Sequence, residues 1–497
     1  MKRIFLALLF VSGSMVINGQ SAFREKYRPQ IHFSPRGNWM NDPNGMVFYK
    51  GVYHLFFQYY PDSTVWGPMH WGHATSKDLV HWREQPIALY PDSLGYIFSG
   101  SAVVDKNNTS LLGKNGRVPL VAAFTHHNIK MERAGNKNFQ YQSLAYSLDD
   151  GKSWIKYANN PVLKNPGITD FRDPKIMWYE ADRKWIMTLA TKDRVTFYTS
   201  KNLKDWTKQS EFGESLGAHG GVWECPDLFS IDYKGKTIWV LLVSINPGGP
   251  NGGSATQYFT GNFDGQFFKP FQTDTRWLDY GTDNYAGVTW SNTGRRKIFI
   301  GWMSNWQYAN IVPTQKWRSA TTLPRELTIQ KIGESYFVSS LPVKELDILN
   351  KDTKVITMHA PVKDITLSEG PGKIELSSGK AESFSFTFSN RSGEMVIAGY
   401  DQGSNEYYID RTRSGKTDFE SKFAARHTAP RIGNSTGLNM TLITDEASIE
   451  MFADNGLTVM TDIFFPATPY GNVQFKCGEN FSLKKLAYTS LKSIWRQ

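Results

Sequence analysis

A short segment that recurs along the chain restricts its fold more than any other feature. Each copy starts at a small residue, contains Asn or Asp and closes with an aromatic residue; the copies are Ser76–Trp82, Ser147–Trp154, Ser200–Trp206 and, more loosely, Gly261–Phe268. The closing aromatic residues lie 72, 52 and 62 residues apart. That spacing leaves room for about four strands with their connections, and such repetition is typical of the blades of a β-propeller.

The residues between the copies favour strands. Short runs rich in Val, Ile, Phe, Tyr and Trp alternate with clusters of Gly, Asn, Asp and Pro, whereas helical periodicity is hard to find. The chain is therefore predicted to be all-β. Residues 26–340 have room for five blades, whose first strands would start near Asp42, 98–101, Asp173, Glu224 and 279–286.

After residue 341 the repeat stops and a different β pattern begins. Ser383–Phe388 alternates polar and apolar residues, as in a strand with one buried face. Asn455-Gly456 between two apolar runs is a strong signal for a β-hairpin. We therefore predict a five-bladed β-propeller in residues 26–340, followed by a C-terminal β-sandwich in residues 355–495, with a linker at 341–355.

Three acidic residues stand directly before apolar strands. Asp42 lies in Trp39–Gly45, Asp173 in Phe171–Lys175, and Glu224 in Trp223–Asp227. A single Asp-Pro-Asn-Gly is most simply an Asx-type turn before a strand. All three acids, however, head predicted first strands, and first strands line the central channel of a propeller, so the three carboxyl groups are expected to converge at one channel mouth.

Converging carboxyl groups point to sugar chemistry. Glycoside hydrolysis requires two carboxyl groups that flank the bond, one attacking or activating water and one protonating the leaving oxygen. No nucleophile-elbow serine is present, and Cys225 beside Glu224 is best explained as a small packing residue. Asp42, Asp173 and Glu224 therefore form the only coherent catalytic set.

Length, charge and the N-terminal segment indicate the domain organisation and the location of the protein. At 497 residues the chain exceeds the usual size of a single core, so two domains are expected. The net charge of +10 includes no run of five Lys or Arg residues, which argues against a nucleic-acid surface. Residues 1–19 have the order of a secretory signal peptide, with Lys2-Arg3 before an apolar run, so we expect an exported protein. No segment reaches the roughly 20 apolar residues of a membrane span.

Metal and cofactor chemistry is not expected. His70 and His73 would lie on opposite faces of a strand because their separation is odd. The stretch Gly248–Ser254 lacks the lysine and the following helix of a phosphate-binding loop. Two distant cysteines, Cys225 and Cys477, exclude a disulfide framework.

Together the motifs resemble glycoside hydrolase family 32. The stretches WMNDPNG, WGHATSKDLVHW, FSGS, FRDP, WECPD and GWMSNW carry this resemblance, which covers essentially the whole chain after the signal segment. The chain is similar above all to bacterial levanases and other exo-acting fructanases of that family, and more distantly to invertases. The resemblance implies a five-bladed propeller with a β-sandwich and metal-free, retaining hydrolysis of β-linked fructofuranosyl units.

The resemblance also implies a role for each site residue. Asp42 would be the nucleophile, Glu224 the acid/base, and Asp173 would hold fructose hydroxyls and stabilise the transition state. The residues that match pocket positions of the family are Asn41, Gln58, Trp66, Phe98, Ser99, Arg172 and Trp302. The expected reaction is release of terminal fructose from a fructan such as levan or inulin, with sucrose as a further candidate substrate.

Several alternatives stay open from the sequence. An inverting hydrolase of arabinan or xylan side chains could use three acids on a similar scaffold, with its carboxyl groups about 6.5–9.5 Å apart instead of about 5–5.5 Å. A fructosyltransferase or an endo-acting fructanase would share the residues named here. A sugar-binding protein without activity is the non-enzymatic alternative. Linkage preference and oligomeric state are not specified by the sequence.

Overall fold

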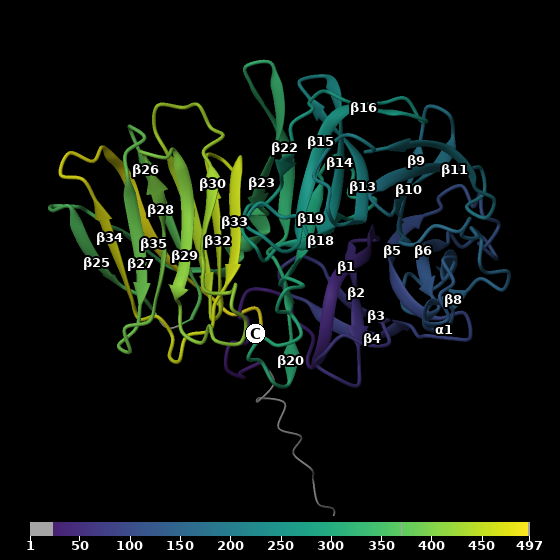
Figure 1. Cartoon of the computed structure of the whole chain (residues 1–497), viewed down its shortest axis with the longest axis horizontal. Coiled ribbons are helices and arrows are strands. Elements are labelled where there is room, and N and C mark those ends of the chain that lie inside the picture. Colours follow the sequence, from purple (N-terminus) through teal and green to yellow (C-terminus); the bar gives the residue numbers. More distant parts are fainter. Residues whose placement is uncertain (1–22, 369, 496–497) are drawn as a thin grey trace, which may run out of the picture.

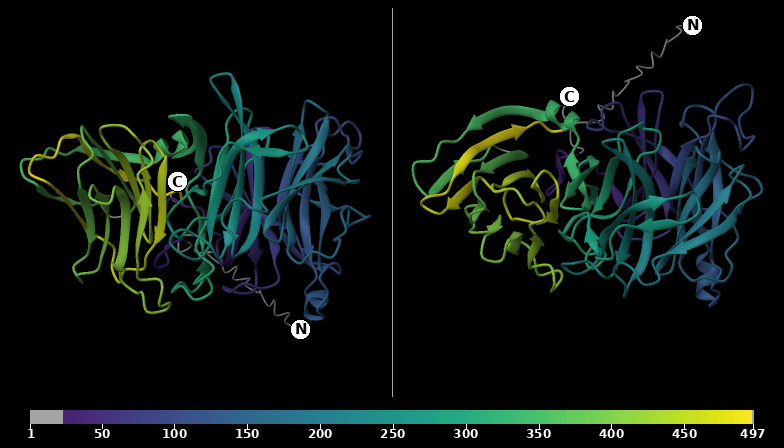
Figure 2. Two further views of the ribbon diagram at one scale, coloured as in Figure 1. Left: turned by 45° about the horizontal axis from the view of Figure 1, so that its top comes forward. Right: turned by 90° about the horizontal axis from the view of Figure 1, so that it is seen from above.

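The computed structural model describes residues 23–368 and 370–495 and consists almost entirely of strands. The predicted signal segment, residues 1–19, lies outside these residues. A ring of sheets and a sandwich of two further sheets lie side by side (Figures 1 and 2). Within the described ranges, no helix is long and apolar enough to cross a membrane.

The ring contains five sheets of four or five strands. The first holds β1 (Asn38–Tyr49), β2 (Val52–Tyr60), β3 (His70–Ser76), β4 (Arg83–Leu89) and β20 (Trp317–Arg318). The second holds β5 (Tyr96–Val104), β6 (Leu120–His127), β7 (Gln140–Ser147) and β8 (Ile155–Lys156), with helix α1 (Ile129–Arg133) between β6 and β7. The third holds β9 (Phe171–Tyr179), β10 (Lys184–Thr191), β11 (Arg194–Ser200) and β12 (Thr207–Phe212).

The fourth sheet holds β13 (Val222–Tyr233), β14 (Lys236–Asn246), β15 (Ala255–Phe263), β16 (Phe268–Pro270) and β17 (Arg276–Trp277). The fifth holds β18 (Tyr285–Thr289), β19 (Ile298–Met303), β21 (Ala320–Thr321), β22 (Arg325–Ile332) and β23 (Ser335–Pro342). The first strands β1, β5, β9, β13 and β18 each contact the next around the ring, and β18 contacts β1. This closed ring of sheets is the β-propeller that the repeat predicts.

The repeated segment forms the same turn in successive sheets. It joins the third and fourth strands, and in three copies a serine hydroxyl accepts the backbone N–H two residues on: Ser76 from Asp78, Ser147 from Asp149 and Ser200 from Asn202. Each of these turns also contains a residue with φ near +65°, namely Leu79, Asp150 or Leu203. Side chains that hydrogen-bond their own backbone favour such turns, which explains why the segment recurs.

The sandwich packs two six-stranded sheets face to face. One holds β24 (Asn350–Val355), β35 (Leu483–Leu491), β26 (Gly372–Ser378), β31 (Asn439–Asp445), β32 (Ser448–Ala453) and β33 (Thr458–Ile463). The other holds β25 (Val362–Thr366), β34 (Asn472–Cys477), β27 (Phe384–Ser389), β28 (Met395–Asp401), β29 (Glu406–Arg413) and β30 (Arg426–Pro430). A 3₁₀ helix, η1 (Lys344–Leu349), connects β23 to β24.

Two sequence features of the sandwich can be checked directly. Phe384, Phe386 and Phe388 of β27 are buried in the core, as the alternation predicts. The predicted hairpin at Asn455-Gly456 joins β32 and β33. β24 begins at Asn350, before the predicted start of the sandwich. This strand could not be predicted from the sequence because its residues, Asn-Lys-Asp-Thr-Lys-Val, show no alternation of apolar and polar side chains.

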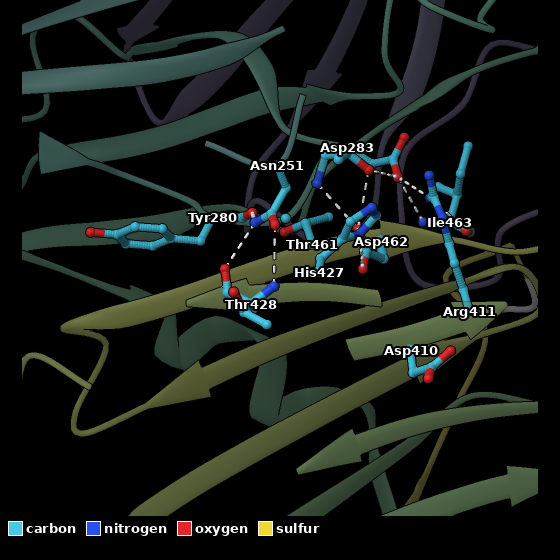
Figure 3. A network of polar contacts seen from close by, with 12 residues as sticks. Asn251, Tyr280, Asp283, Asp410, Arg411, His427, Thr428, Thr461, Asp462 and Ile463 are labelled. Carbon is cyan, nitrogen blue, oxygen red and sulfur yellow. Dashed lines mark hydrogen bonds and ion pairs between the residues drawn. The ribbon is translucent and has the colours of Figure 1, made fainter. Parts of the chain in front are cut away.

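Buried charges join the propeller to the sandwich. Arg411 of β29 donates to Asp283, which lies just before β18, at 2.8 Å, and Asp283 also accepts the backbone N–H of Ile463 (Figure 3). Arg325 of β22 lies 2.8 Å from Asp279 and 2.6 Å from Glu450 of β32, and all three side chains are fully buried. Removing one member of such a pair leaves an uncompensated buried charge, so the network fixes how the two parts meet.

His32 extends this network to the segment before β1. Its Nδ1 lies 2.7 Å from Asp445 Oδ2 and its Nε2 lies 2.9 Å from Glu450 Oε1, so both ring nitrogens can donate only if the ring is protonated. Although burial opposes the charge, the two carboxylates raise the pKa of His32 to about 9. The folded protein therefore binds this proton more tightly than the unfolded chain does.

We expect the protein to lose stability as the pH rises from about 6.5 to 9. The His32 contribution is fully present below the unfolded pKa of 6.5 and is lost as the pH passes through about 9, a change of about 3 kcal/mol. Urea unfolding at several pH values measures it. The pH dependence should shrink in His32→Gln but persist in the exposed control His359→Gln; an unchanged slope in His32→Gln would contradict the assignment.

Candidate active site

All five first strands carry an irregularity at the same end of the channel. The register shifts between Met40 and Pro43 in β1, between Ile97 and Gly100 in β5, and between Tyr285 and Val288 in β18. β9 and β13 shift beside Asp173 and Glu224. A bulge bends a strand and redirects its side chains. The shifts therefore turn residues of separate strands toward one point.

Asp42 of β1 is held by two side-chain donors. Asn41 Nδ2 donates to its Oδ1 and Ser99 Oγ, from β5, donates to its Oδ2, both at 2.9 Å. Asn41 is itself fixed, because its Oδ1 accepts the Trp39 indole N–H at 2.7 Å. This support fixes the direction in which the Asp42 carboxyl group faces the channel.

Asp173 of β9 lies deeper and is buried. Its φ of +63° is unusual for a residue with a side chain, and Cys225 of β13 has a φ of +46°. The backbone N–H of Cys225 donates to Asp173 Oδ2 at 3.0 Å. The Cys225 thiol lies 3.6 Å from the same oxygen and 3.8 Å from Asp42 Oδ2, so it separates the two aspartates.

Glu224 of β13 is held from both sides. Arg172 donates to its Oε1 from Nε at 3.1 Å and from Nη2 at 2.9 Å, and the Tyr285 hydroxyl of β18 donates to its Oε2. Arg172 also pairs with Asp170 at 2.5 Å. Glu224 therefore has a fixed geometry with one cationic donor and one neutral donor.

The crowding of carboxyl groups changes their acidity. Burial and the charge of Glu224 raise the pKa of Asp42 to about 6, although Asn41 and Ser99 oppose the rise. Burial raises the pKa of Asp173 to about 7 against the nearby charge of Arg172, and Glu224 and Asp42 add to the rise. The two aspartates of the cluster therefore hold a proton closer to neutral pH than isolated carboxyl groups do.

These groups open into a pocket of about 380 Å³. Nine of the ten residues singled out from the sequence line it: Asn41, Asp42, Gln58, Trp66, Phe98, Ser99, Arg172, Asp173 and Glu224. Gln58 Nε2 is buried and has no acceptor among the described residues, so its N–H groups are free for a ligand. Around this pocket, as elsewhere in residues 23–368 and 370–495, no group of three His, Cys, Asp or Glu side chains could hold a metal ion.

Trp302 is the exception. Its side chain is fully buried in β19 and does not line the pocket; its ring packs 4.9 Å from that of Trp306, which does. Both tryptophans belong to the stretch Gly301–Trp306, but β19 ends at Met303 and Trp306 lies in the loop that follows. The loop carries the second ring to the pocket while the strand keeps the first in the core.

The sequence did not reveal several other pocket residues. The additional lining residues are His127, Ile129, Glu132, Phe139, Gln140, Asp170 and Trp306. Ile129 and Glu132 lie on α1, which forms part of the rim, and Phe98 stacks on His127 at 4.3 Å. Tyr285, also missed as a site residue, lies within 279–286, the predicted start of the fifth blade. Apart from Tyr285, these residues lie in connections or in β6 and β7, the second and third strands of their sheet, where nothing in the local pattern signals a site.

The loop that carries Trp306 is fixed from below by the sandwich. The Tyr308 hydroxyl donates to Asp283 at 2.7 Å and accepts from Arg411 Nη2 at 3.1 Å. Further along the loop, Asn310 Oδ1 accepts the backbone N–H of Trp66 at 2.9 Å. Two aromatic walls of the pocket, Trp66 and Trp306, therefore depend on one loop that a sandwich arginine helps to hold.

Comparison with known proteins agrees with this geometry. The N-terminal domain of glycosyl hydrolases family 32 matches residues 32–340, and the C-terminal domain of the same family matches residues 348–490. A levanase of Bacillus subtilis (strain 168) is 45% identical, covering 99% of this chain and 74% of that protein. An extracellular exo-inulinase of Aspergillus ficuum is 39% identical and covers 90% of each chain.

A solved structure has the same overall shape. The crystal structure of exo-inulinase from Aspergillus awamori superposes with a TM-score of 0.87 at 35% identity, covering 95% of this chain and 100% of that one. The family domains span both the propeller and the sandwich of this protein. The chain therefore belongs to glycosyl hydrolase family 32.

Proposed function

We propose that the protein is an exo-acting, retaining fructan hydrolase that releases terminal fructose from levan or inulin, with sucrose as a further substrate. The observation that carries this proposal is the pair of rigidly held carboxyl groups in one pocket: Asp42 between Asn41 and Ser99, and Glu224 between Arg172 and Tyr285. The levanase and exo-inulinase relatives support a fructan as the substrate.

In the proposed reaction the two carboxyl groups act in turn. Asp42 attacks the anomeric carbon and forms a covalent fructosyl intermediate while Glu224 protonates the leaving oxygen; Glu224 then deprotonates the water that releases fructose. Asp173 accepts hydrogen bonds from fructose hydroxyls. No metal or cofactor is required in this sequence of steps.

The shape of the channel favours attack at chain ends. Below the pocket, Lys175 Nζ of β9 donates to Thr289 O of β18 at 2.5 Å and lies 3.1 Å from Asp227 Oδ2 of β13. These buried contacts tie three first strands together across the channel. A polysaccharide therefore cannot thread through the propeller, and a pocket closed at its base suits a chain end.

We further propose that residues 26–340 are the catalytic domain, that 355–495 form an accessory domain, and that the protein is exported after removal of residues 1–19. The extracellular exo-inulinase relative supports export. The sandwich is accessory in the sense that all pocket-lining residues belong to the propeller.

Replacing Glu224 tests the acid/base role. Glu224→Gln is expected to bind substrate normally but to lose on the order of 10²–10⁴ in kcat, as for a lost general acid. The amide can keep its oxygen toward Arg172 and offer its NH₂ to the Tyr285 oxygen, so the pocket should keep its shape. The loss should be smaller for fructosides with good leaving groups. Glu132→Gln, on the rim, is the matched control; equal losses for all leaving groups would assign Glu224 another role.

The anomeric form of the product tests the nucleophile. NMR of the first fructose released, recorded before mutarotation, should show the β-anomer, because direct attack by Asp42 followed by water inverts the centre twice. Free fructose should be the first product that chromatography detects in early digests of levan or inulin. An α-anomer would overturn the role of Asp42, and an early ladder of oligosaccharides would overturn the exo mode.

Tyr308→Phe tests whether the loop positions Trp306 for substrate binding. Loss of the hydroxyl frees the loop from Asp283 and Arg411, so KM should rise about three- to tenfold, equivalent to ~1 kcal/mol of binding free energy, while kcat changes little. In a Trp306→Ala background the same change should have no further effect on KM. Tyr336→Phe, in β23 and away from the pocket, is the control. Additive effects of Tyr308→Phe and Trp306→Ala would contradict the link.

A further inference from the structure

The far end of the central channel opens into a second cavity of about 630 Å³. The first strands β5, β9, β13 and β18 line it, and it shares no lining residue with the catalytic pocket. Asp173 faces the pocket and Lys175 the cavity; Glu224 faces the pocket and Asp227 the cavity. The contacts of Lys175 with Asp227 and Thr289 lie between the two spaces, so the reaction described above makes no use of the second one.

The charges around this cavity balance. Three lysines and three carboxylates line it: Lys106, Lys175, Lys297, Asp105, Glu180 and Asp227. An anion would meet the carboxylates and a cation would meet the lysines, so the cavity selects neither. A neutral ligand fits this balance best.

Two of these charged groups have unused hydrogen-bonding capacity. The Lys297 ammonium has no hydrogen bond or ion pair with any described residue, and burial lowers its pKa although Asp227 opposes this. Asp227 Oδ2 accepts from Thr289 N and Oγ1 at 2.6 and 2.7 Å, whereas its buried Oδ1 has no donor in the described part of the chain. The cavity thus holds a free donor beside an incompletely satisfied acceptor.

Aromatic rings supply the apolar part of the lining. Trp178 of β9 and Trp239 of β14 are partly exposed there. The Trp178 N–H donates to Glu180, but the Trp239 indole N–H has no acceptor among the described residues. A tryptophan of this kind offers a flat apolar face with a polar edge, which suits the mixed apolar and hydroxylated faces of a sugar ring.

We propose that this cavity is a second sugar-binding site, which holds a fructosyl unit of the polysaccharide at a distance from the catalytic pocket. A neutral sugar has hydroxyls that both donate and accept, so such a ligand can accept from Lys297 or from the Trp239 N–H and can pack its apolar face on a partly exposed tryptophan ring. The identity of the sugar rests on the proposed fructan hydrolase function. The cavity would attach the enzyme to polymeric substrate and would take no part in cleaving sucrose.

Affinity electrophoresis in native gels that contain polymeric levan tests the proposal. The Glu224→Gln protein serves as the parent because it should bind levan without digesting it. Adding Lys297→Met, which keeps the aliphatic stem, should weaken retardation by levan about tenfold, as for one lost charge-assisted hydrogen bond. Lys354→Met, on the exposed strand β24, is the matched control and should leave retardation unchanged. Equal retardation of the Lys297 variant and its parent would overturn the site.

A variant whose new side chain fills the second cavity provides an independent test of the proposed site. Ser230 lines the cavity, is partly exposed and makes no side-chain hydrogen bond with a described residue, so Ser230→Trp should occupy the space without removing a contact. In an otherwise unchanged enzyme, Ser230→Trp and Lys297→Met should both lower kcat/KM for polymeric levan and leave kcat/KM for sucrose unaltered. Equal losses on both substrates, or no loss on levan, would contradict a separate polymer site.

Direct observation separates this proposal from the proposed function. Crystals of the Glu224→Gln protein soaked in fructose should show a sugar beside Lys297 and Trp239, and the same soak of Ser230→Trp crystals should show none there. Failure of the unaltered enzyme to release fructose from levan, inulin or sucrose would refute the fructan hydrolase function alone. An empty cavity in the soaked crystals would refute the second site alone.

Discussion

Repulsion among buried carboxyl groups is the constraint around which this structure is built. Asp42, Asp173 and Glu224 share one pocket, and a buried carboxylate without donors is costly. The donors that compensate come from different strands: Ser99 from β5, Arg172 from β9, the Cys225 amide from β13 and Tyr285 from β18. All five first strands therefore have to be held in register, since displacing one strand would remove a donor from a carboxyl group that another strand carries.

The sandwich extends this requirement beyond the propeller. Its buried pairs, Arg411 with Asp283 and Glu450 with Arg325, contribute little to stability in general, but they allow only one arrangement of the partners. Asp283 also accepts from Tyr308, whose loop carries Trp306. The ion pairs that join the two parts thus lie directly beneath one wall of the pocket. We interpret the sandwich as a support for the substrate-binding loop.

The sequence predicted the acids and the fold better than the outline of the pocket. Asp42, Asp173 and Glu224 could be found because each heads a repeated first strand, and the repeat itself fixes where those strands converge. Trp302 and Trp306 could not be told apart, because the strand ends between them and the path of a loop leaves no periodic signal. Gln140 reaches the pocket from β7, the third strand of the second sheet, and Asp170 from a connection; only the folded chain brings these positions together.

A bulge in one first strand lets that strand supply side chains to two spaces at the ends of a single channel. Asp173 and Lys175 are two residues apart on β9; the first lines the pocket and the second lines the cavity. The bulge beside Asp173 turns the carboxyl group toward the pocket, whereas Lys175 crosses the channel to Asp227 and Thr289. The cation that closes the channel also balances the charge of Asp227. A blind catalytic pocket and a separate cavity behind it therefore receive side chains from the same strand, and the contacts of Lys175 close the channel between them.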